Sequence, residues 1–353
     1  MNLMNTLAST YEISVHTCRN QKSLVTYQPP YVSIHRYPSV EIGQGIIKRL
    51  FSYFTFTWRA CSGLLRERPN CLLYYETNSV FPVVFFYLLV RRKPMLCIHY
   101  HEYNSEEQYK TGMKLVYLSY LIEKKYLWKR AAWISHTNAQ RMELFRKDYP
   151  CLETEKLHLL PNYPPKAWQT SKAEKNTPSE PIRIVYVGSL GLDNFYLKEF
   201  CTWVLSQNGA VQFDIYSQNS TPQVQQYLQG LDTRWIKSNF TGTWYYDLPK
   251  VLRQYDVGVI LYKGFNQNFT FNETNKLFEY HVCGLDVWFS EETLGIHKYK
   301  TQHTYPRIVA IDFRNLDPFN WHDALRKEGM EYRMLDVNCE NIYIHLFNYQ
   351  KSK

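Results

Sequence analysis

The repeated alternation of short apolar runs with longer amphipathic segments constrains the fold of this chain more than any other feature. Short runs rich in Val, Ile, Tyr and Phe favour buried strands, whereas the longer periodic segments favour helices. Because parallel strands are joined by crossovers that usually contain a helix, the alternation predicts parallel sheets covered by helices. The predicted strands are 12–16, 31–36, 71–75, 95–99, 133–136 and 157–160 in the first half, and 183–187, 211–216, 234–237, 256–262, 286–289 and 307–311 in the second.

The chain of 353 residues is long enough for two α/β domains of ordinary size. A stretch rich in Pro, Ser, Lys and Thr, without periodicity, lies between the two halves and is typical of a linker. The predicted organisation is a first domain over 1–165, a linker over 166–181, a second domain over 182–330 and a C-terminal helix over 331–353 that packs back on the first domain. The main helices predicted in the first domain are 45–66, 79–90, 113–130 and 138–147.

The positive charge is confined to the first half. Residues 1–162 contain 21 Lys and Arg against 12 Asp and Glu, whereas residues 163–353 contain 20 of each, so the first half carries the whole net charge of +9. A basic half predicts an anionic partner there, either a membrane surface or a phosphorylated acceptor. Basic residues stand beside aromatic ones around 48–58 and 124–130, as in helices that lie at a membrane surface with their cations extended towards water; a solvated face over a core stripe is the alternative. No nucleic-acid-binding module is recognisable, so nucleic acid is not expected as a partner.

No segment reads as a membrane span or a secretion signal. The most apolar run, 80–90, is about half of the roughly 20 residues that cross a bilayer, and residues 1–10 are polar. The eight cysteines are scattered without a C-x-x-C pair, which favours buried reduced thiols over disulfides or zinc ligands. We therefore expect a cytoplasmic protein, associated with the inner face of the membrane if its basic half contacts lipid.

The segment from Asn272 to Gly284 predicts a helix that carries an unusual charge. Asn272 or Thr274 can cap its start and Gly284 can end it. Lys276 falls in the first turn, where a cation opposes the helix dipole. This placement is explained if an anion lies between the lysine and the free amides of the helix start, as phosphates do. The alternative is an ordinary amphipathic helix with a solvated Lys276–Glu279 pair.

The run Asn275-Lys276-Leu-Phe-Glu279-Tyr with its following glycine resembles a segment of bacterial GT-B glycosyltransferases of the family-four-like kind, although Asp286 stands where that family usually has proline. The resemblance implies two Rossmann-like domains facing each other across a cleft. It also implies that the helix start, with Lys276 and Asn275, faces the diphosphate of a nucleotide sugar, and that Glu279 binds the ribose. A second glutamate of the family, eight positions earlier, is Phe271 here, and the nearby Glu273 is out of register.

Further donor-binding residues follow from the same resemblance. Gly188 and Ser189 come directly after the strand 183–187, where the family's chain turns towards the diphosphate, but Ser189 stands where the family often has arginine. Lys263 is a further candidate for the phosphate charge, although a lone loop lysine is more often solvated. Trp244 lies in a segment similar to the one that lines the nucleotide base, and a helix-capping core position is its alternative role.

In the first domain, His101 and Glu102 follow the strand 95–99 and are candidates for the reacting centre. Open α/β sheets bind ligands at the carboxyl ends of their strands. The His-x-His-Glu run also suggests a metal, but neighbouring residues on a strand point to opposite faces and no third ligand appears, so no metal is predicted. Glu76 and 135–138 end strands on the same side.

The resemblance implies a glycosyltransferase that moves a sugar from a nucleotide-diphosphate donor to a hydroxyl of a glycan or lipid-linked acceptor in surface polysaccharide synthesis, with retention and without a metal or other cofactor. Two alternatives stay open: another GT-B enzyme, such as an epimerase or an inverting transferase, and a non-catalytic nucleotide-sugar-binding or assembly subunit. The second is favoured by the polar start, because the family's first domain usually opens with a strand and a glycine-rich loop. The residues do not identify the sugar, the base, the acceptor, the linkage or the oligomeric state.

Overall fold

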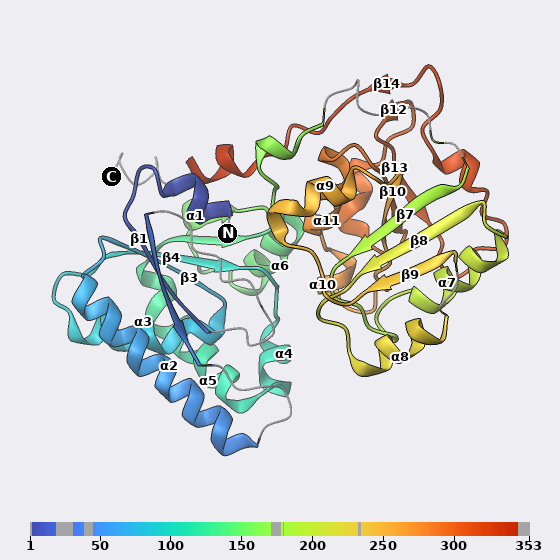
Figure 1. Ribbon diagram of the computed structural model, residues 1–353. Helices are drawn as coiled ribbons and strands as arrows, with labels where there is room; N and C mark the ends of the chain where they lie inside the picture. The colour runs from blue at the N-terminus through green and yellow to red at the C-terminus, as the bar shows by residue number, and fades with distance from the viewer. Residues whose placement is uncertain are drawn as a thin grey trace. The chain divides into compact units, whose positions relative to one another are not determined.

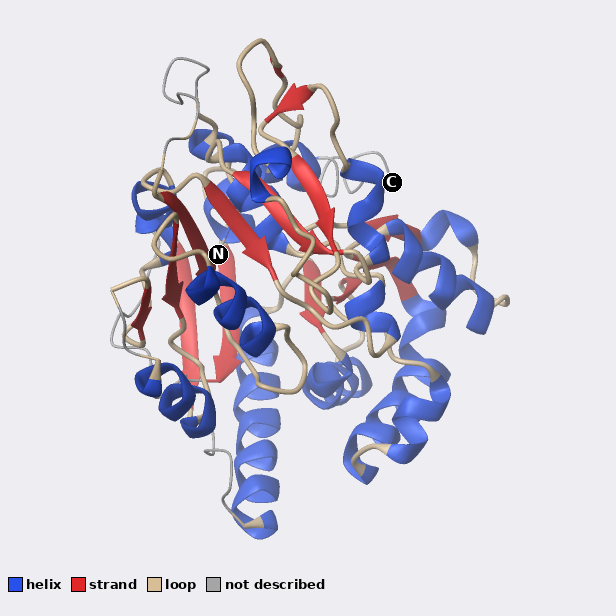
Figure 2. Ribbon diagram, turned by 90° about the vertical axis from the view of Figure 1, so that its right-hand side faces the viewer, coloured by secondary structure: helices blue, strands red, loops and turns tan. Residues whose placement is uncertain are grey.

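The computed structural model describes residues 2–18, 31–38, 45–170, 178, 180–231 and 234–344. It forms two compact units, one from Met1–Pro161 with Glu340–Lys353 and one from Asn162–Cys339. Each unit has its own buried apolar core. Helices flank the strands of the sheets in both units (Figure 1, Figure 2).

The second unit contains a six-stranded parallel sheet with the order β13-β11-β10-β7-β8-β9. Counted within the unit from β9, this order is 3-2-1-4-5-6, the doubly wound arrangement of Rossmann folds. Its strands are β7 (Ile182–Val187), β8 (Val211–Tyr216), β9 (Ile236–Asn239), β10 (Val257–Ile260), β11 (Asp286–Ser290) and β13 (Ile308–Ile311). Its helices are α7 (Leu197–Ser206), α8 (Pro222–Gly230), α9 (Leu248–Leu252), α10 (Gln267–Thr270) and α11 (Asn275–Val282).

The first unit contains a four-stranded parallel sheet, β3-β4-β5-β6, and a separate parallel pair, β1-β2. The strands are β1 (Ile13–Cys18), β2 (Val32–Tyr37), β3 (Cys71–Tyr75), β4 (Met95–Tyr100), β5 (Ala131–His136) and β6 (Leu157–Leu159). The helices are α1 (Asn2–Leu7), α2 (Ile46–Glu67), α3 (Val80–Leu89), α4 (Glu106–Thr111), α5 (Lys114–Ile122) and α6 (Ala139–Asp148). The predicted parallel α/β architecture is therefore confirmed in both units.

The core of the second unit explains why its strands read as continuous apolar runs. Every residue of β10 and β11 is buried, because helices cover both faces of the sheet. Asp286, the one acidic residue in β11, is fully buried and accepts hydrogen bonds from the amides of Arg307 (2.7 Å) and Arg326 (2.9 Å). The Arg326 guanidinium lies 3.4 Å from Asp286 and 3.5 Å from Asp256, which pairs the buried charge.

The first part of the predicted linker 166–181 packs against the second unit. Trp168 is buried in the core of the second unit, its carbonyl accepts from Arg253 (3.3 Å), and the Thr170 amide donates to Val282 (2.9 Å). The residues around Trp168 are mostly polar, so the sequence did not indicate that this one large aromatic side chain is buried. Residues 171–177 and 179 lie outside the described residues.

Two predicted helices also need correction. In 331–353, Glu331–Tyr332 forms strand β14, which pairs with β12 (Thr304–Tyr305), and a helix begins only at Cys339. The predicted helix 113–130 is α-helical over α5 alone and continues as a wider π turn, Glu123–Leu127, and a tight 3₁₀ turn, Trp128–Arg130. At the start of the π turn, Glu123 is fully buried and accepts from the hydroxyls of Tyr74 (2.7 Å) and Thr77 (2.9 Å). Hydrogen bonds between residues so far apart in the chain are not visible in the periodicity of the sequence.

The part of the chain that the structure describes contains no helix that is both long and apolar enough to cross a membrane. All eight cysteines are free thiols, and five of them are buried: Cys61, Cys97, Cys201, Cys283 and Cys339.

Candidate functional site

The point where the strand order of the second sheet reverses lies between β7 and β10. The chain leaves β7 towards β8 on one side and enters β10 from the other, so the loops after these two neighbouring strands diverge. A crevice at this position, outside the carboxyl ends of the strands, is where open α/β sheets bind their ligands. Gly188 follows β7 directly, and Tyr262 lies two residues after β10.

Helix α11 begins beside this point without a side-chain cap. It starts at Asn275, after Thr274, and the Thr274 side chain makes no capping hydrogen bond to the helix start. The chain leaves the helix at Gly284 with a φ of +82°, which favours glycine, as predicted. The start falls three residues later than Asn272, so Lys276 is the second helical residue. An uncapped helix start suits an anion, because the helix dipole is positive there.

The Lys276 side chain is buried, with 9 % of the residue exposed. Its Nζ donates to the Tyr262 hydroxyl at 3.0 Å and lies 5.5 Å from the ring centroids of both Tyr186 and Tyr262. Glu279 is only 4 % exposed. The alternative of a solvated Lys276–Glu279 pair is therefore wrong, because the helix face that carries both side chains packs against the sheet.

Gly188 lies directly against Lys276. A Cβ on Gly188 would come within 2.7 Å of Lys276 Cε and 2.9 Å of its Nζ, and the φ of Gly188 is +135°. A side chain here would therefore both strain the backbone and displace the lysine. The Gly188 amide already donates to the Tyr216 carbonyl at 2.9 Å, so the glycine contributes space more than a hydrogen-bond donor.

Lys276 also changes the acidity of Tyr262. Burial alone raises the pKa of a phenol, but the charge of Lys276 and its hydrogen bond outweigh burial and lower the pKa of Tyr262 below its ordinary value. The lysine Nζ thus lies against a phenol oxygen and two aromatic rings.

Glu279 is held by Asn275, one turn earlier on the same helix. The Asn275 side-chain amide, Nδ2, donates to Glu279 Oε1 at 2.8 Å. Burial raises the pKa of Glu279, against the Asn275 hydrogen bond and the positive charge of Lys276. Gly188 after β7 and Lys276, Asn275 and Glu279 on α11 thus lie on two elements that meet, and their roles in donor binding stay predictions.

Two other predicted donor-binding residues, Glu273 and Lys263, form hydrogen bonds with side chains of neighbouring elements. Both oxygens of the Glu273 carboxylate are engaged, by Lys298 Nζ (2.8 Å) and by the Tyr299 hydroxyl (2.7 Å). Lys263 Nζ donates to Glu199 at 3.1 Å and lies over the Tyr196 ring. These contacts give both residues structural partners on neighbouring elements.

Ser189 and Trp244 lie at the surface of the second unit. Ser189 is exposed, and its carbonyl accepts from the Tyr186 hydroxyl at 2.7 Å, which closes the turn after β7. Trp244 is half-buried immediately before the turn Tyr245–Asp247, with its ring centroid 5.9 Å from that of Tyr246.

In the first unit, the predicted residues gather at the carboxyl ends of β3 and β4. The His101 amide donates to Glu76 Oε1 at 2.5 Å and the Glu102 amide to the same oxygen at 3.3 Å. Glu76 has a φ of +60°, which is uncommon for a residue with a side chain and recurs at functional sites. Burial raises the pKa of Glu76 to about 7, against the two amide hydrogen bonds.

His101 and Glu102 diverge from each other. The His101 ring is half-buried and stacks on Tyr75 at 5.4 Å, and its carbonyl accepts from the Arg141 guanidinium. Burial, and next the charge of Arg141, lower the pKa of His101, so its ring is neutral at pH 7. Glu102 is exposed. Within the described residues, neither belongs to a group of three side chains able to hold a metal ion.

Sequence reasoning missed Tyr262 and Tyr186, whose side chains hold Lys276. Tyr262 was assigned only as the end of a strand, and Tyr186 as part of an apolar run. A tyrosine at the carboxyl end of a strand is a visible sign of a site residue. Its contact with Lys276, however, depends on which strands are neighbours in the sheet.

Comparison with known proteins shows the fold. No protein-family model matches the chain, and neither does any curated protein sequence. Among solved structures, sucrose-phosphate synthase from Thermosynechococcus elongatus is similar with a TM-score of 0.62 and 15 % identity, over 99 % of this chain and 91 % of that one. Anabaena HepE, in complex with UDP and glucose, is similar with a TM-score of 0.56 and 10 % identity, over 92 % of this chain and 87 % of HepE. The apo lipopolysaccharide outer core galactosyltransferase WaaB is similar with a TM-score of 0.54 and 11 % identity, over 91 % of this chain and 85 % of WaaB.

This chain has the GT-B fold. The match extends over nearly the whole chain in all three comparisons, so both α/β units belong to it. The fold assignment predicted from the resemblance is confirmed.

Proposed function

We propose that the protein is a glycosyltransferase that takes a sugar from a nucleotide-diphosphate donor and transfers it to a hydroxyl group. The observation that carries this proposal is the buried Lys276, placed on the uncapped start of α11 at the switch point of the second sheet. A diphosphate is the ligand that a helix start and an adjacent buried cation together favour. The similarity to HepE, whose structure holds UDP and glucose, agrees with such a donor.

Lys276 and the amides of α11 would bind the diphosphate, and Glu279 would accept hydrogen bonds from the ribose hydroxyls. During transfer the bond between the sugar and the terminal phosphate breaks, and negative charge grows on the leaving phosphate. Lys276 would stabilise that charge more strongly in the transition state than in the bound donor, which is how a fixed cation accelerates a reaction. Asn275 would keep the Glu279 carboxylate oriented, as its 2.8 Å hydrogen bond does in this structure.

The proposed transfer retains the configuration of the sugar and needs no metal. In such a reaction the acceptor hydroxyl forms the new glycosidic bond, and the leaving phosphate takes its proton, so no protein base is required. His101 would then orient the acceptor or the donor phosphate as a neutral imidazole, a role that suits its lowered pKa. Determination of the product's anomeric configuration by NMR tests retention.

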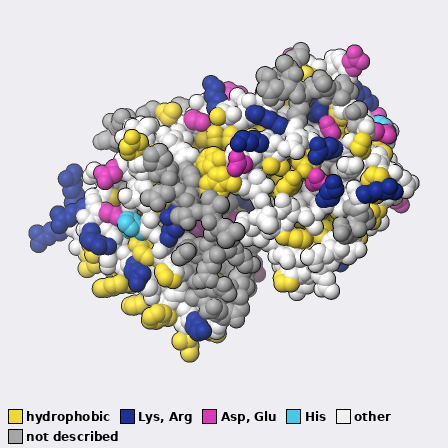
Figure 3. All heavy atoms as spheres, in the orientation of Figure 1, with side chains coloured by type: hydrophobic (Ala, Val, Ile, Leu, Met, Phe, Trp, Pro, Cys, Tyr) yellow, Lys and Arg dark blue, Asp and Glu magenta, His cyan; other side chains and the backbone are white. Residues whose placement is uncertain are grey.

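The acceptor is proposed to be lipid-linked and reached at an anionic membrane surface. Helix α2 exposes its large apolar side chains and buries small ones: Ile46, Ile47, Leu50, Phe51, Phe54 and Trp58 are exposed, whereas Thr57, Ala60, Cys61 and Gly63 are buried. Lys48, Arg49 and Arg59 stand exposed among them. Figure 3 shows hydrophobic side chains with basic ones between them in the region where Figure 1 draws α2. This mixture is typical of helices that lie in a lipid interface.

The deciding experiment is calorimetric titration of the protein with UDP, GDP and CDP and their sugars, followed by turnover of the donor that binds. We expect Lys276→Ala to lower kcat/KM for that donor by about 100-fold or more, the usual loss when one group that stabilises developing charge is removed. Lys250→Ala is the matched control, because Lys250 lies in the same unit with its side chain 81 % exposed. An unchanged kcat/KM in Lys276→Ala would contradict the proposal.

A second candidate is epimerisation of a sugar nucleotide. A putative UDP-N-acetylglucosamine 2-epimerase from Listeria monocytogenes is similar with a TM-score of 0.50 and 10 % identity, and shares the fold. NMR of the sugar nucleotide incubated with the protein alone distinguishes the two reactions. An epimerase converts the donor without an acceptor, whereas a transferase needs one. Binding without either reaction would favour a non-catalytic subunit.

A further inference from the structure

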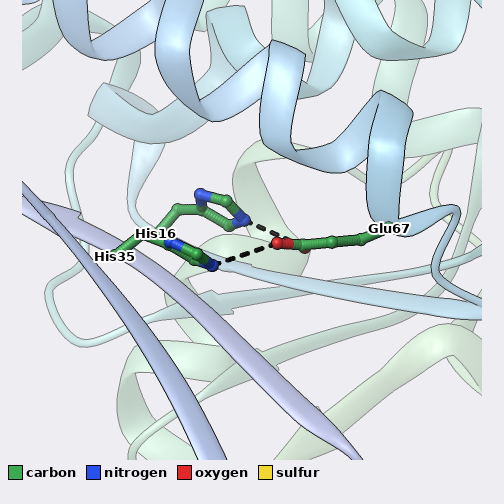
Figure 4. A group of neighbouring side chains, drawn as sticks. All are labelled: His16, His35 and Glu67. Carbon is green, nitrogen blue, oxygen red and sulfur yellow. Dashed lines mark hydrogen bonds and ion pairs between the residues drawn. The ribbon is translucent and has the colours of Figure 1, made fainter.

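A second cluster of chemically reactive side chains lies in the first unit, on elements other than those that carry Lys276, Glu279 and His101. His16 in β1 and His35 in β2 are paired across the parallel ribbon, and Glu67 ends helix α2. The two imidazole rings stack with centroids 4.8 Å apart and an interplanar angle of 18°. Figure 4 shows both rings facing the Glu67 carboxylate.

The distances within this cluster are close to those of a metal coordination sphere. His16 Nε2 lies 3.1 Å from Glu67 Oε2, and His35 Nε2 lies 3.2 Å from Glu67 Oε1. All three ligand atoms lie within 4.8 Å of one another. A tetrahedral zinc ion has bonds of about 2.0–2.2 Å to such ligands, which places ligand atoms roughly 3.3–3.6 Å apart. The three side chains would have to move from their present hydrogen-bonded positions to bring one ligand atom each to that distance from the ion.

We propose that His16, His35 and Glu67 bind a divalent transition-metal cation of the zinc class. Two imidazole nitrogens and one carboxylate oxygen form a ligand set that suits Zn²⁺ and Co²⁺ and does not suit Mg²⁺ or Ca²⁺, which prefer oxygen. Three protein ligands leave a fourth position for water or another small ligand.

The surroundings of the cluster hold the ligands in place. His16 Nδ1 is 2.8 Å from the hydroxyl of the buried Tyr37, and Ser14 Oγ donates to Glu67 Oε1 at 3.0 Å. Outer hydrogen bonds of this kind orient metal-binding histidines and carboxylates. When Nε2 binds a metal, the ring proton must reside on Nδ1, and the Tyr37 oxygen can accept it. The same hydroxyl can donate to Nδ1 in the opposite tautomer.

Helix α2 provides the space for the His16 ring through a glycine. A Cβ on Gly63 would lie 2.3 Å from His16 Cε1, so any larger residue would push the ring out of the cluster. Gly63 stands one helical turn before Glu67, on the same face of α2. The helix therefore supplies both the carboxylate and the gap into which the neighbouring imidazole fits.

A bound ion would fasten the β1–β2 pair to the end of α2. Within the described residues these two strands share no ladder with the four-stranded sheet, so they lack the hydrogen bonds that hold β3 to β6 together. A metal that links both strands to the helix stabilises the folded unit in proportion to its binding. This role is independent of the sugar-transfer reaction proposed above.

The test measures binding of Zn²⁺ to the full chain after treatment with a chelator, by equilibrium dialysis and calorimetry, with Mg²⁺ as the comparison. We expect one Zn²⁺ per chain, a raised unfolding temperature with Zn²⁺ and no response to Mg²⁺. Co²⁺ serves as a spectroscopic probe, because nitrogen and oxygen ligands give d–d bands without the charge-transfer band of a thiolate. This distinguishes the cluster from the free cysteines.

Variants of the exposed ligands keep the test independent of folding. The His35 side chain is 44 % exposed, so His35→Ala removes a ligand with little effect on packing, and Glu67→Gln keeps the shape of Glu67. Both should lose stoichiometric binding, whereas His303→Ala, at an exposed histidine of the second unit, should retain it. Tyr37→Phe should weaken binding by about 10- to 100-fold, the usual effect of removing an outer hydrogen bond.

Two outcomes would overturn the proposal. Equal Zn²⁺ binding by the wild-type protein and His35→Ala would locate the ion elsewhere. Absence of Zn²⁺ binding by a folded wild-type chain would mean that the carboxylate only accepts hydrogen bonds from the two imidazoles.

Discussion

At the scale of the residue, the candidate donor site depends on a glycine that leaves room for a buried lysine. Replacement Gly188→Ala would place a Cβ 2.7 Å from Lys276 Cε at a backbone φ of +135°. We expect a loss of about 1–3 kcal/mol in the free energy of unfolding, the usual cost of such a backbone strain, together with weaker binding of the nucleotide. Denaturant unfolding and calorimetric titration with the preferred nucleoside diphosphate measure the two effects.

Gly230→Ala provides the control within the same unit. Gly230 ends helix α8, and nothing lies within 4 Å of a Cβ built on it. Alanine at a compatible position reduces the freedom of the unfolded chain and should be neutral or slightly stabilising. If Gly188→Ala behaved as Gly230→Ala does, the close approach of Gly188 and Lys276 would have no energetic consequence.

At the scale of the element, helix α2 is the surface from which membrane contact is expected. We expect the wild-type protein to sediment with vesicles that contain anionic lipid and not with neutral vesicles, because its exposed apolar side chains need neighbouring cations to reach a charged surface. The double variant Phe51→Ser, Phe54→Ser should lose most of this binding, since both rings are exposed, by 71 % and 66 %.

Leu294→Ser, at an exposed leucine of the second unit, is the matched change outside α2. High salt should weaken the wild-type binding, because the attraction between exposed cations and anionic lipid is screened. Vesicle binding that persists in the α2 double variant would place the membrane contact on another element.

At the scale of the whole molecule, a buried carboxyl in the first unit makes stability depend on pH. Burial raises the pKa of Glu123 from its ordinary value of 4.5 to about 7, against hydrogen bonds from Tyr74, Tyr100 and Thr77. Between these two values the unfolded chain ionises while the folded chain keeps the proton, so stability is fully present below pH 4.5 and is lost as the pH rises through about 7. The expected slope is about 1.4 kcal/mol for each pH unit in that window.

Glu123→Gln isolates this contribution. The amide cannot ionise and its oxygen can still accept from Tyr74, so the variant should lack the slope that Glu123 adds to the wild-type protein. Urea unfolding of both proteins at several values between pH 4.5 and 8 gives the difference. Glu76 titrates in the same range, and the Glu123 charge raises its pKa, so the difference between the two proteins reports Glu123 together with this coupling. Parallel curves for the two proteins would show that Glu123 ionises at its ordinary pKa.

Much of the local structure could be predicted from neighbouring residues in the sequence. The bounds predicted for 71–75 and 211–216 agree with β3 and β8, because alternating apolar and aromatic runs between turn residues leave little ambiguity. The sequence also placed Lys276 in the first turn of a helix and Gly284 at its end, since both depend on neighbouring residues alone. Local hydrogen bonding and backbone preference act over a few residues, and a sequence displays them directly.

Which of these residues come into contact could not be predicted, because it depends on the order of the strands in the fold. The strand order places β7 beside β10, although about 70 residues separate them, and this neighbourhood brings Gly188 and Tyr262 to Lys276. It likewise gave Glu273 and Lys263 other partners and brought His16, His35 and Glu67 together across spacings that no ligand motif contains. Pairing across a sheet and burial against a helix depend on contacts between distant segments, so the chemistry of these side chains exists only in the folded chain.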